Sequence, residues 1–368
     1  MLAESVASGG ATAVALDLFG DVDTRAAAAA WHDIGSGGQL ALDGAALLDA
    51  LARLADEGDV DAWVAGSGFE ARPDLLARGA TLLPLLGNPP EVVRRVRTPG
   101  WFYPWLAARR VPHAAVSVAP PVQPEGWLSK DARACGGWHV RPALTAVPGG
   151  GAGHYFQRRI EGVPMSVLFL ADGHRWHIAG IARQTIRPLG GHQYVHRGGV
   201  GPIDLPAAAL DALRAMVDSI AGGLGLVGLN GIDFILHEDG PLLIELNPRP
   251  TASVALFDDC VHGELLLAHA AVCRGAALDA LRFQPLRALR GSEVVFAPHA
   301  GRIDDEPADW LAGQGWCHDL PVAGTAHAWG DPVCSVSARA ESTAEVERLL
   351  AERRRAVLDA VAHAASAS

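Results

Sequence analysis

Lys130 is the only lysine in a chain that also carries 29 arginines, and a loop rich in small residues, 132–137, follows it closely. A lysine ammonium is a compact point charge on a flexible stem, whereas an arginine guanidinium is a planar fork. A site that must place one charge between phosphate oxygens therefore favours lysine. Lys130 is a candidate phosphate contact. The alternative is that a single lysine survived by chance in an arginine-rich composition.

Three side chains with oxygen ligands, Asp233, Glu245 and Asn247, stand in two apolar runs that flank a polar turn at Asp239-Gly240. The runs and the turn predict a β-hairpin. Residues two apart share a strand face, so Glu245 and Asn247 point the same way, and Asp233 on the facing strand can lie beside them. Two carboxylates and an amide suit Mg²⁺, whose coordination is commonly completed by phosphates. The alternative is a hairpin with ordinary solvent-facing acids.

Together these motifs resemble the ATP-grasp superfamily of carboxylate-amine ligases, most clearly over residues 127–253. In that family a lysine followed by a Gly/Ser-rich flap covers the phosphates, which corresponds to Lys130 and to Gly136-Gly137. The family's metal-binding acids correspond to Asp233 and Glu245, with Asn247 beside them. The resemblance implies ATP and Mg²⁺ as cofactors.

The segment 154–166 corresponds to the strand and hinge with which the family recognises adenine. The resemblance implies that the following groups contact the base: the Gln157 side chain, the backbone of Arg158 and Ile160, and the Ile244 side chain packed on the ring.

The sequence departs from the family pattern at two positions. The first phosphate-binding cation of the family would fall at Pro99, and the nearest basic residue is Arg97, so one phosphate cation is missing or displaced. The glutamate that often binds ribose corresponds to Pro164, and Glu161 is the candidate replacement. Neither departure touches the predicted metal ligands.

The chemistry implied by the resemblance begins with attack of a substrate carboxylate on the γ-phosphoryl group of ATP. The resulting acyl phosphate is then converted to an amide by an amine. Lys130 and nearby arginines would spread the developing charge, and Arg249 could hold the carboxylate by a bidentate contact. Its alternative role is a structural salt bridge.

Four histidines and four arginines lie between Gly173 and Gly199. No histidine spacing there matches a known zinc ligand set, and the arginines would repel a cation. The segment suits a phosphate or an acidic substrate better than a metal, and Arg183 is its candidate catalytic residue. The alternative is an ordinary surface segment.

The first third of the chain predicts a small α/β unit with a strand at 13–16, a helix at 42–54 and a strand at 60–65. Ligands of parallel sheets bind beyond the carboxyl ends of the strands. The residues at those ends form a candidate wall of the substrate site, with ordinary loop turns as the alternative. They are Asp17, Gly66, Ser67, Gly68 and Glu70.

The predicted fold class is α/β, with α+β character in the grasp region, and the predicted architecture is an ATP-grasp fold. We expect an N-terminal parallel α/β domain at 1–95, a lid subdomain at 96–155, a catalytic subdomain at 156–275 and a C-terminal β-rich cap at 276–368. The cap should end in a helix, because Ser342 and Glu345 form a capping box ahead of an apolar stripe.

Composition narrows the class of protein. A chain of 368 residues suggests two or three domains, and a net charge of −11 without a basic cluster argues against nucleic acid as a partner. The five cysteines form no C-x-x-C pair, and no apolar run reaches the length of a membrane span. We expect a cytoplasmic enzyme that acts on small-molecule carboxylate and amine substrates, amino acids among them. A homodimer is compatible with the sequence.

Segments 16–24, 66–70 and 161–166 resemble a branch of ATP-grasp ligases associated with one-carbon coenzymes, which includes tyramine-glutamate ligase of methanofuran synthesis. The resemblance implies an amino-acid or glutamate ligase in methylofuran or tetrahydromethanopterin assembly. The alternatives are another peptide-forming ligase and a sensor that binds ATP without ligation.

Overall fold

An eight-stranded antiparallel sheet forms the centre of the molecule. The computed structural model describes residues 2–36, 39–145, 153–286 and 288–367. The strand order is β13-β12-β9-β10-β11-β14-β18-β16. The bounds are β9 (Val163–Asp172), β10 (Trp176–Leu189), β11 (His192–Gly201), β12 (Val227–His237), β13 (Gly240–Asn247), β14 (Leu289–Phe296), β16 (Cys317–His318) and β18 (Pro332–Ala340). The predicted β12–β13 hairpin is confirmed.

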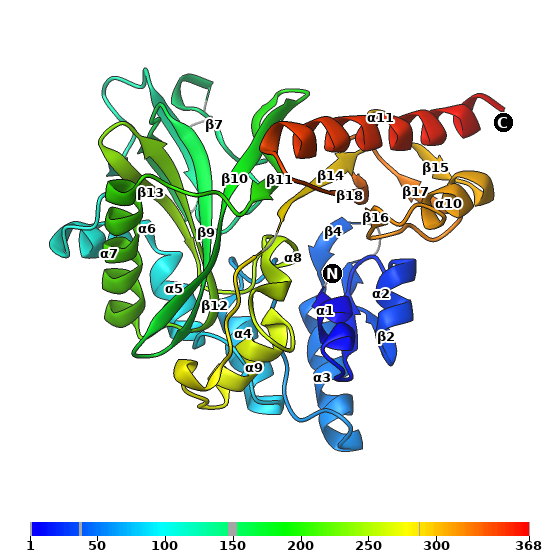
Figure 1. Ribbon diagram of the computed structural model, residues 1–368, viewed down its shortest axis with the longest axis horizontal. Helices are drawn as coiled ribbons and strands as arrows, with labels where there is room; N and C mark the ends of the chain where they lie inside the picture. Colours follow the sequence, from blue (N-terminus) through cyan, green and yellow to red (C-terminus); the bar gives the residue numbers. More distant parts are fainter. Residues whose placement is uncertain (1, 37–38, 146–152, 287, 368) are drawn as a thin grey trace.

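Helices cover both faces of this sheet (Figure 1). On β9, Val167 and Phe169 pack in the cluster that includes α7 (Ala207–Leu224), while Leu168 and Leu170 pack in the cluster that includes α8 (Val254–Phe257) and α9 (Leu265–Cys273). Successive strand residues point to opposite faces, so β9 must be apolar on both. Its continuous apolar run has this cause.

A smaller four-stranded sheet, in the order β5-β8-β6-β7, stands beside the main one. Its strands are β5 (Val116–Ser117), β6 (Trp127–Asp131), β7 (Arg141–Pro142) and β8 (His154–Arg158), with the 3-10 turn η1 (Ala143–Thr145) after β7. Two helices precede it, α5 (Pro90–Val96) and α6 (Pro99–Ala108). In the antiparallel pairing of β6 with β8, Lys130 stands opposite Tyr155.

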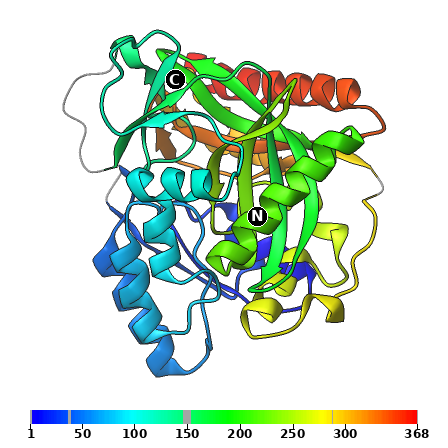
Figure 2. The ribbon, with the colours of Figure 1, turned by 90° about the vertical axis from the view of Figure 1, so that its left-hand side faces the viewer.

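The first third of the chain gathers on one side of the molecule, where Figure 2 shows its blue and cyan helices. It contains α1 (Leu2–Ser8), β1 (Val14–Asp17), α2 (Val22–Ala27), β2 (Ala30–Asp33), β3 (Gly35–Ser36), β4 (Gln39–Leu42), α3 (Gly44–Glu57) and α4 (Pro73–Leu82). Strands β1 and β2 pair in parallel. Helix α3 is capped at its start by Asp43, whose carboxylate accepts hydrogen bonds from two backbone N–H groups, and at its end by Gly58 in the left-handed conformation.

The strand predicted at 60–65 is wrong. Only Trp63 forms a bridge, in parallel with Leu85, and its indole N–H donates to the Leu83 carbonyl. Trp63 belongs to a core cluster with residues of α3 and α4. Trp63 is therefore buried against helices, an environment that a short apolar run alone does not separate from a strand.

The last part of the chain extends the main sheet, because β14 pairs with β11 of the grasp region and β18 pairs with β14. The remaining elements are η2 (Asp258–Cys260), η3 (Leu278–Ala280), β15 (Gly301–Ile303), α10 (Asp305–Ala312), β17 (Thr325–His327) and α11 (Thr343–Ala367). Helix α11 lies along β14 and β18 (Figure 1). The predicted Ser342 cap is confirmed, since the Ser342 hydroxyl accepts from the Glu345 N–H at 3.2 Å.

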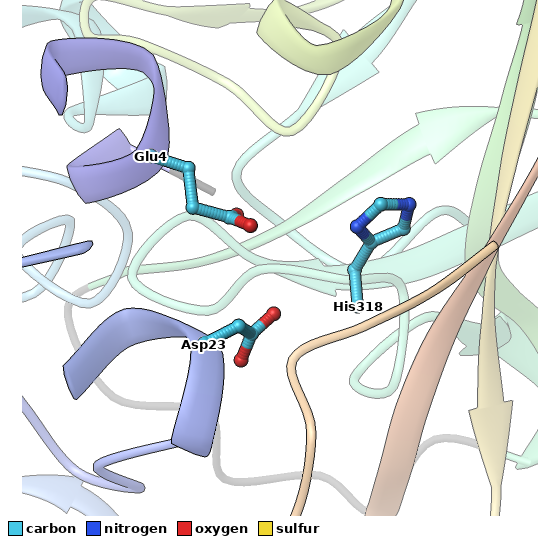
Figure 3. A group of neighbouring side chains, drawn as sticks. All are labelled: Glu4, Asp23 and His318. Atoms are coloured by element: carbon cyan, nitrogen blue, oxygen red, sulfur yellow. The ribbon is translucent and has the colours of Figure 1, made fainter. Parts of the chain in front are cut away.

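The first and last parts of the chain meet at Glu4, Asp23 and His318, whose side-chain ligand atoms lie within 4.8 Å of one another (Figure 3). The Asp23 carboxylate accepts from the backbone N–H of Asp319 at 2.7 Å. Burial, together with neighbouring acids, raises the pKa of Asp21 to about 7.

In the described part of the chain, none of the helices has the length and apolar character needed to cross a bilayer.

Candidate functional site

Strands β12 and β13 bring the three predicted oxygen ligands together. Asp233 stands opposite Glu245 in the antiparallel register, and the Asn247 amide donates to Asp233 Oδ2 at 3.0 Å. A register shift follows Asp233, so the pairing continues between Phe234 and Leu243. The hairpin thus presents two carboxylates and an amide from one surface, as an oxygen-ligated cation site requires. We refer to Asp233, Glu245 and Asn247 as the acid centre.

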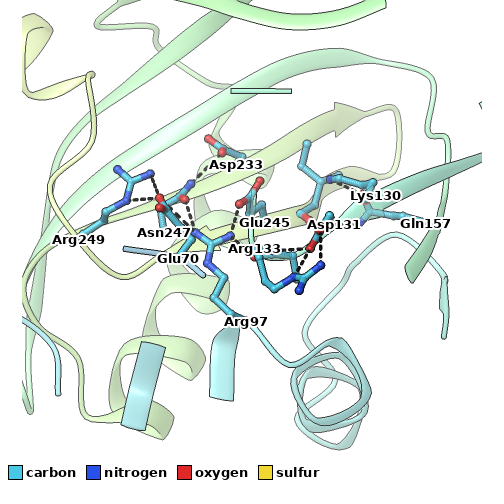
Figure 4. A network of polar contacts seen from close by, with 12 residues as sticks. Glu70, Arg97, Lys130, Asp131, Arg133, Gln157, Asp233, Glu245, Asn247 and Arg249 are labelled. Atoms are coloured by element: carbon cyan, nitrogen blue, oxygen red, sulfur yellow. Dashed lines mark hydrogen bonds and ion pairs between the residues drawn. The ribbon is translucent and has the colours of Figure 1, made fainter. Parts of the chain in front are cut away.

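Arg97, at the end of α5, reaches into this acid centre (Figure 4). One of its terminal nitrogens donates to Glu245 Oε1, and the other donates to Asn247 Oδ1 at 2.8 Å. The residue is only 8% exposed, and its Nε has no hydrogen-bond partner among the described residues. An unsatisfied buried donor is unfavourable, so an anion that offered it an acceptor would be stabilised here.

The pKa values of the two carboxylates of the acid centre, Asp233 and Glu245, are shifted in opposite directions. Burial and the charge of Glu245 raise the pKa of Asp233 to about 7. Burial also acts on Glu245, but Arg97 and Lys130 outweigh it and hold the pKa of that carboxyl below its ordinary value. A divalent cation would favour the ionised form of both groups.

Lys130 is buried on β6, and its ammonium donates to Gln157 Oε1 at 3.1 Å. The Gln157 amide nitrogen donates to the Ile244 carbonyl at 3.0 Å and to the Tyr103 hydroxyl at 3.2 Å. Gln157, predicted to contact adenine, is 2% exposed. Its amide orients Lys130 and joins β8 to the β13 backbone beside the acid centre, and its contact with adenine stays a prediction.

The residues predicted to form the adenine hinge lie after Gln157. The Arg158 N–H already donates to the Ala115 carbonyl at 2.8 Å, so a backbone contact to a base would use the Arg158 carbonyl. Ile160 is half-buried, whereas Arg158 and Glu161 are exposed. The Ile244 carbonyl also accepts from the Tyr103 hydroxyl at 3.0 Å. Tyr103 is a polar contact of this region that the sequence did not single out.

The glycine flap is docked on strand β11. Gly136 accepts a backbone hydrogen bond from His196 at 2.9 Å. Gly137 has a φ of +78°, and a Cβ there would stand 1.9 Å from the Tyr194 carbonyl oxygen. Only glycine permits this approach. The flap also carries His139, whose buried Nδ1 has no partner among the described residues and whose pKa is lowered by burial and by Lys130.

Arg183 and Gln184 are consecutive residues of β10, so their side chains point to opposite faces of the sheet. The guanidinium of Arg183, predicted to be catalytic, pairs with Glu347 of α11. The amide of Gln184 donates to Asp233 Oδ1 at 2.7 Å. Because side chains alternate along a strand, the residue next to the predicted one reaches the acid centre.

Arg249 is bound to Glu70, which joins the grasp region to the first third of the chain. Its Nε donates to Glu70 Oε1 at 2.7 Å, and the Gly68 N–H donates to Glu70 Oε2 at 2.8 Å. The Arg97 guanidinium lies 4.0 Å from the same carboxylate. Although burial opposes ionisation, Arg249 and Arg97 hold the pKa of Glu70 below its ordinary value. Arg249 thus forms an ion pair with Glu70, and its contact with a substrate carboxylate stays a prediction.

A cavity opens beside Glu70, between the first third of the chain and the loop after β13, and we call it the Glu70 pocket. Its lining residues are Ala65, Gly66, Phe69, Glu70, Leu76, Leu85, Leu86, Gly87, Asn88, Val93, Arg97, Pro248, Arg249 and Pro250. Of the predicted substrate wall, Gly66 and Glu70 line it, whereas Ser67 and Gly68 are exposed at the surface. Asp17 instead shapes its own turn, since its carboxylate accepts from Gly20 N at 2.8 Å and from the Trp31 indole at 2.7 Å.

Part of the chain is similar in sequence to known proteins. Residues 101–253 match the family described as ATP-grasp domain. The carbamoyl phosphate synthase large chain of Mycobacterium bovis is 29% identical over 140 residues, which are 38% of this chain and 12% of that protein. The corresponding large chain of Deinococcus radiodurans is 25% identical over 206 residues, 50% of this chain and 20% of that protein. The chain thus spans a small fraction of the curated relatives it matches.

Solved structures resemble nearly the whole chain. The biotin carboxylase domain of Hydrogenobacter thermophilus 2-oxoglutarate carboxylase, a dimer in complex with MgADP, ADP and bicarbonate, has a TM-score of 0.71 at 14% identity, covering 97% of this chain and 86% of that one. N5-carboxyaminoimidazole ribonucleotide synthetase from Thermus thermophilus has a TM-score of 0.69 at 16% identity, covering 96% and 94%. At such identities the likeness shows the fold, and the predicted ATP-grasp fold is confirmed.

Proposed function

We propose that this protein is an ATP- and Mg²⁺-dependent carboxylate-amine ligase that forms an amide through an acyl phosphate. The observation that carries the proposal is the acid centre on β12 and β13 with Lys130 and Arg97 beside it. Phosphoryl transfer needs carboxylates that bind a metal cation and basic side chains that contact the phosphates, placed together in a buried site. The MgADP bound by the Hydrogenobacter neighbour supports the same choice of cofactors.

The acid centre fits Mg²⁺ by its donor set. Asp233, Glu245 and Asn247 offer carboxylate and amide oxygens, the ligands that Mg²⁺ prefers. The orphaned Nε of Arg97 supports an anion as its neighbour. When bound, Mg²⁺ would neutralise phosphate charge and orient the nucleotide.

The chain's own residues have separate tasks in this mechanism. Lys130, oriented by Gln157, contacts the phosphates as a point charge, and Arg97 turns from Glu245 towards the transferred phosphoryl group. Arg249 orients the acid substrate beside Glu70. The flap at Gly136-Gly137 closes on β11 and excludes water, which would otherwise hydrolyse the acyl phosphate. The amine then displaces phosphate from the acyl carbon.

The finer proposal concerns the pathway. Because segments 16–24, 66–70 and 161–166 resemble the branch with tyramine-glutamate ligase, the amide is proposed to belong to one-carbon coenzyme assembly, of methylofuran or tetrahydromethanopterin, with an amino acid as the acid. A screen of amino acids and amines for ADP release, followed by mass spectrometry of the product, tests it. A product unrelated to amino acids would exclude this pathway.

The mechanism is tested by isotope transfer. With the acid labelled by ¹⁸O in its carboxylate, ATP, Mg²⁺ and the amine, we expect ADP and phosphate that carries ¹⁸O, because that oxygen bridges carbon and phosphorus in the intermediate. Hydroxylamine in place of the amine should give a hydroxamate. AMP as product would mean adenylation, and ATP binding without any acid-dependent turnover would mean a nucleotide sensor; either result would exclude the acyl-phosphate ligase.

A further inference from the structure

The Glu70 pocket has charged groups at one end only. Glu70 and Arg249 form that end, and Arg97 lies 4.0 Å from the Glu70 carboxylate. The same Arg97 guanidinium donates to Glu245 of the acid centre. A carboxylate held at this end would therefore be separated from the proposed site of phosphoryl transfer by a single arginine side chain.

The charged end can also bind a cation. Glu70 is ionised, because Arg249 and Arg97 lower its pKa despite burial, and it is 4% exposed. Two arginines and one carboxylate in contact can bind a ligand that carries both a carboxylate and an ammonium group, since each ligand charge finds an opposite partner. An α-amino acid has these two groups on one carbon.

The rest of the pocket is apolar. Phe69, Leu76, Leu86 and Val93 form much of its wall, each 3–8% exposed. The wall contains one more polar side chain, Asn88, whose amide donates to Asn230 at 2.7 Å and to the Pro248 carbonyl at 3.0 Å and accepts from the Val227 N–H at 3.0 Å. Its hydrogen-bonding groups are already used within the protein.

We propose that the Glu70 pocket selects an α-amino acid with an apolar side chain as the acid substrate. Arg249 and Arg97 hold its carboxylate, Glu70 holds its ammonium, and its side chain packs on Phe69, Leu76 and Val93. This inference rests on the proposed function and narrows its amino acid. A glutamate side chain would place a second carboxylate against this apolar wall without a partner, which is strongly unfavourable.

The experiment compares three acids in two readouts, calorimetric binding in the presence of MgADP and release of ADP from ATP with a panel of amines. The acids are leucine, 4-methylpentanoate, which lacks the ammonium, and glutamate. We expect leucine to bind at least about 10-fold tighter than either of the others, because each alternative loses a partner for one buried charge. Glu70→Gln should reduce the preference for leucine over 4-methylpentanoate.

Two valines of α5 give a matched pair of variants. Val93 lines the pocket, whereas Val96 packs in the core with Phe102 and Tyr103. Val93→Thr and Val96→Thr each add one buried hydroxyl at nearly constant volume and should lower stability by similar amounts. We expect the affinity for leucine to fall several-fold in Val93→Thr alone. An equal loss in both variants would contradict binding in the Glu70 pocket.

The outcomes separate this inference from the proposed function. ADP release that prefers glutamate would overturn the apolar selectivity while supporting the ligase, and equal binding of leucine and 4-methylpentanoate would overturn the role of Glu70. Leucine binding that depends on Val93, without ADP release with any acid and amine, would support the pocket and contradict the ligase.

Discussion

Arg97 separates two regions of different chemistry, the acid centre and the Glu70 pocket. In the acid centre, polar side chains of three strands of one sheet bond to one another: Asn247 of β13 and Gln184 of β10 both donate to Asp233 of β12. In the pocket, loops and helices present apolar side chains around one ion pair. On the proposed function, β12 and β13 of the central sheet position the groups for phosphoryl transfer, whereas the first third of the chain selects the acid substrate.

The largest effect is expected at the acid centre. Glu245→Gln keeps an acceptor for Arg97 but removes a charge, and we expect kcat to fall on the order of 10³-fold because transition-state charge loses its metal anchor. Steady-state ADP release measures it. Asp239→Asn, on the exposed turn of the same hairpin, is the matched control. Full Mg²⁺-dependent turnover in Glu245→Gln would remove this carboxylate from the mechanism.

A buried histidine beside the Glu70 pocket, His269, should make the fold lose stability in acid. His269 Nδ1 accepts from the Leu229 N–H at 2.8 Å, and its Nε2 donates to the carbonyl of Leu86, a pocket residue, at 3.0 Å. Burial lowers its pKa from 6.5 to about 4. Between pH 6.5 and 4 the imidazole is therefore protonated in the unfolded chain but neutral in the folded chain. The contribution of His269 to the free energy of unfolding is complete above pH 6.5 and is lost as the pH falls towards 4.

The loss attributable to His269 should be roughly 3 kcal/mol over that range. Urea unfolding at several pH values measures it, with His269→Gln as the variant in which this part of the slope disappears. His237→Gln, at the end of β12, is the matched histidine control. Parallel curves for wild type and His269→Gln would show that the buried imidazole does not govern acid stability.

Lys130→Arg tests whether the phosphate contact needs a point charge. Arginine keeps the charge, but its planar fork replaces a compact ammonium in the buried contact with Gln157, and we expect ATP affinity to fall about 10- to 100-fold. Binding of a non-hydrolysable ATP analogue measures the change. The affinity for the acid substrate should stay within error, because the Glu70 pocket is separate. Unchanged ATP binding would favour chance survival of this lysine.

The smallest effect is expected in the flap. Gly137→Ala places a Cβ against the Tyr194 carbonyl at a positive φ, which costs roughly 1–2 kcal/mol from the backbone conformation alone. Hydrogen exchange of the His196 amide, which donates to Gly136, should become faster. Gly191→Ala is the control, because Gly191 lies in the turn between β10 and β11 and a Cβ there would have no heavy atom of the described residues within 4 Å beyond its chain neighbours. Equal exchange rates in the two variants would contradict a docked flap.

The sequence predicted much of the fold because several signals are local. The turn at 238–240 between apolar runs predicted the β12–β13 hairpin, and the serine three residues before Glu345 predicted the cap of α11. The strand expected at 60–65 was wrong, because a short apolar run does not reveal whether strands or helices lie alongside. The proposed roles of the site residues stay predictions until they are tested.

By itself, the sequence determined which oxygen ligands share a strand face, because side chains alternate along a strand whatever surrounds it. Only the tertiary structure decided which cation meets them. Arg97 is separated from Glu245 by 148 positions, and Gln184 from Asp233 by 49, so no local pattern contains these contacts. They follow from the packing of α5 against the sheet and from the β10 register, in which one residue of displacement would exchange Gln184 for Arg183.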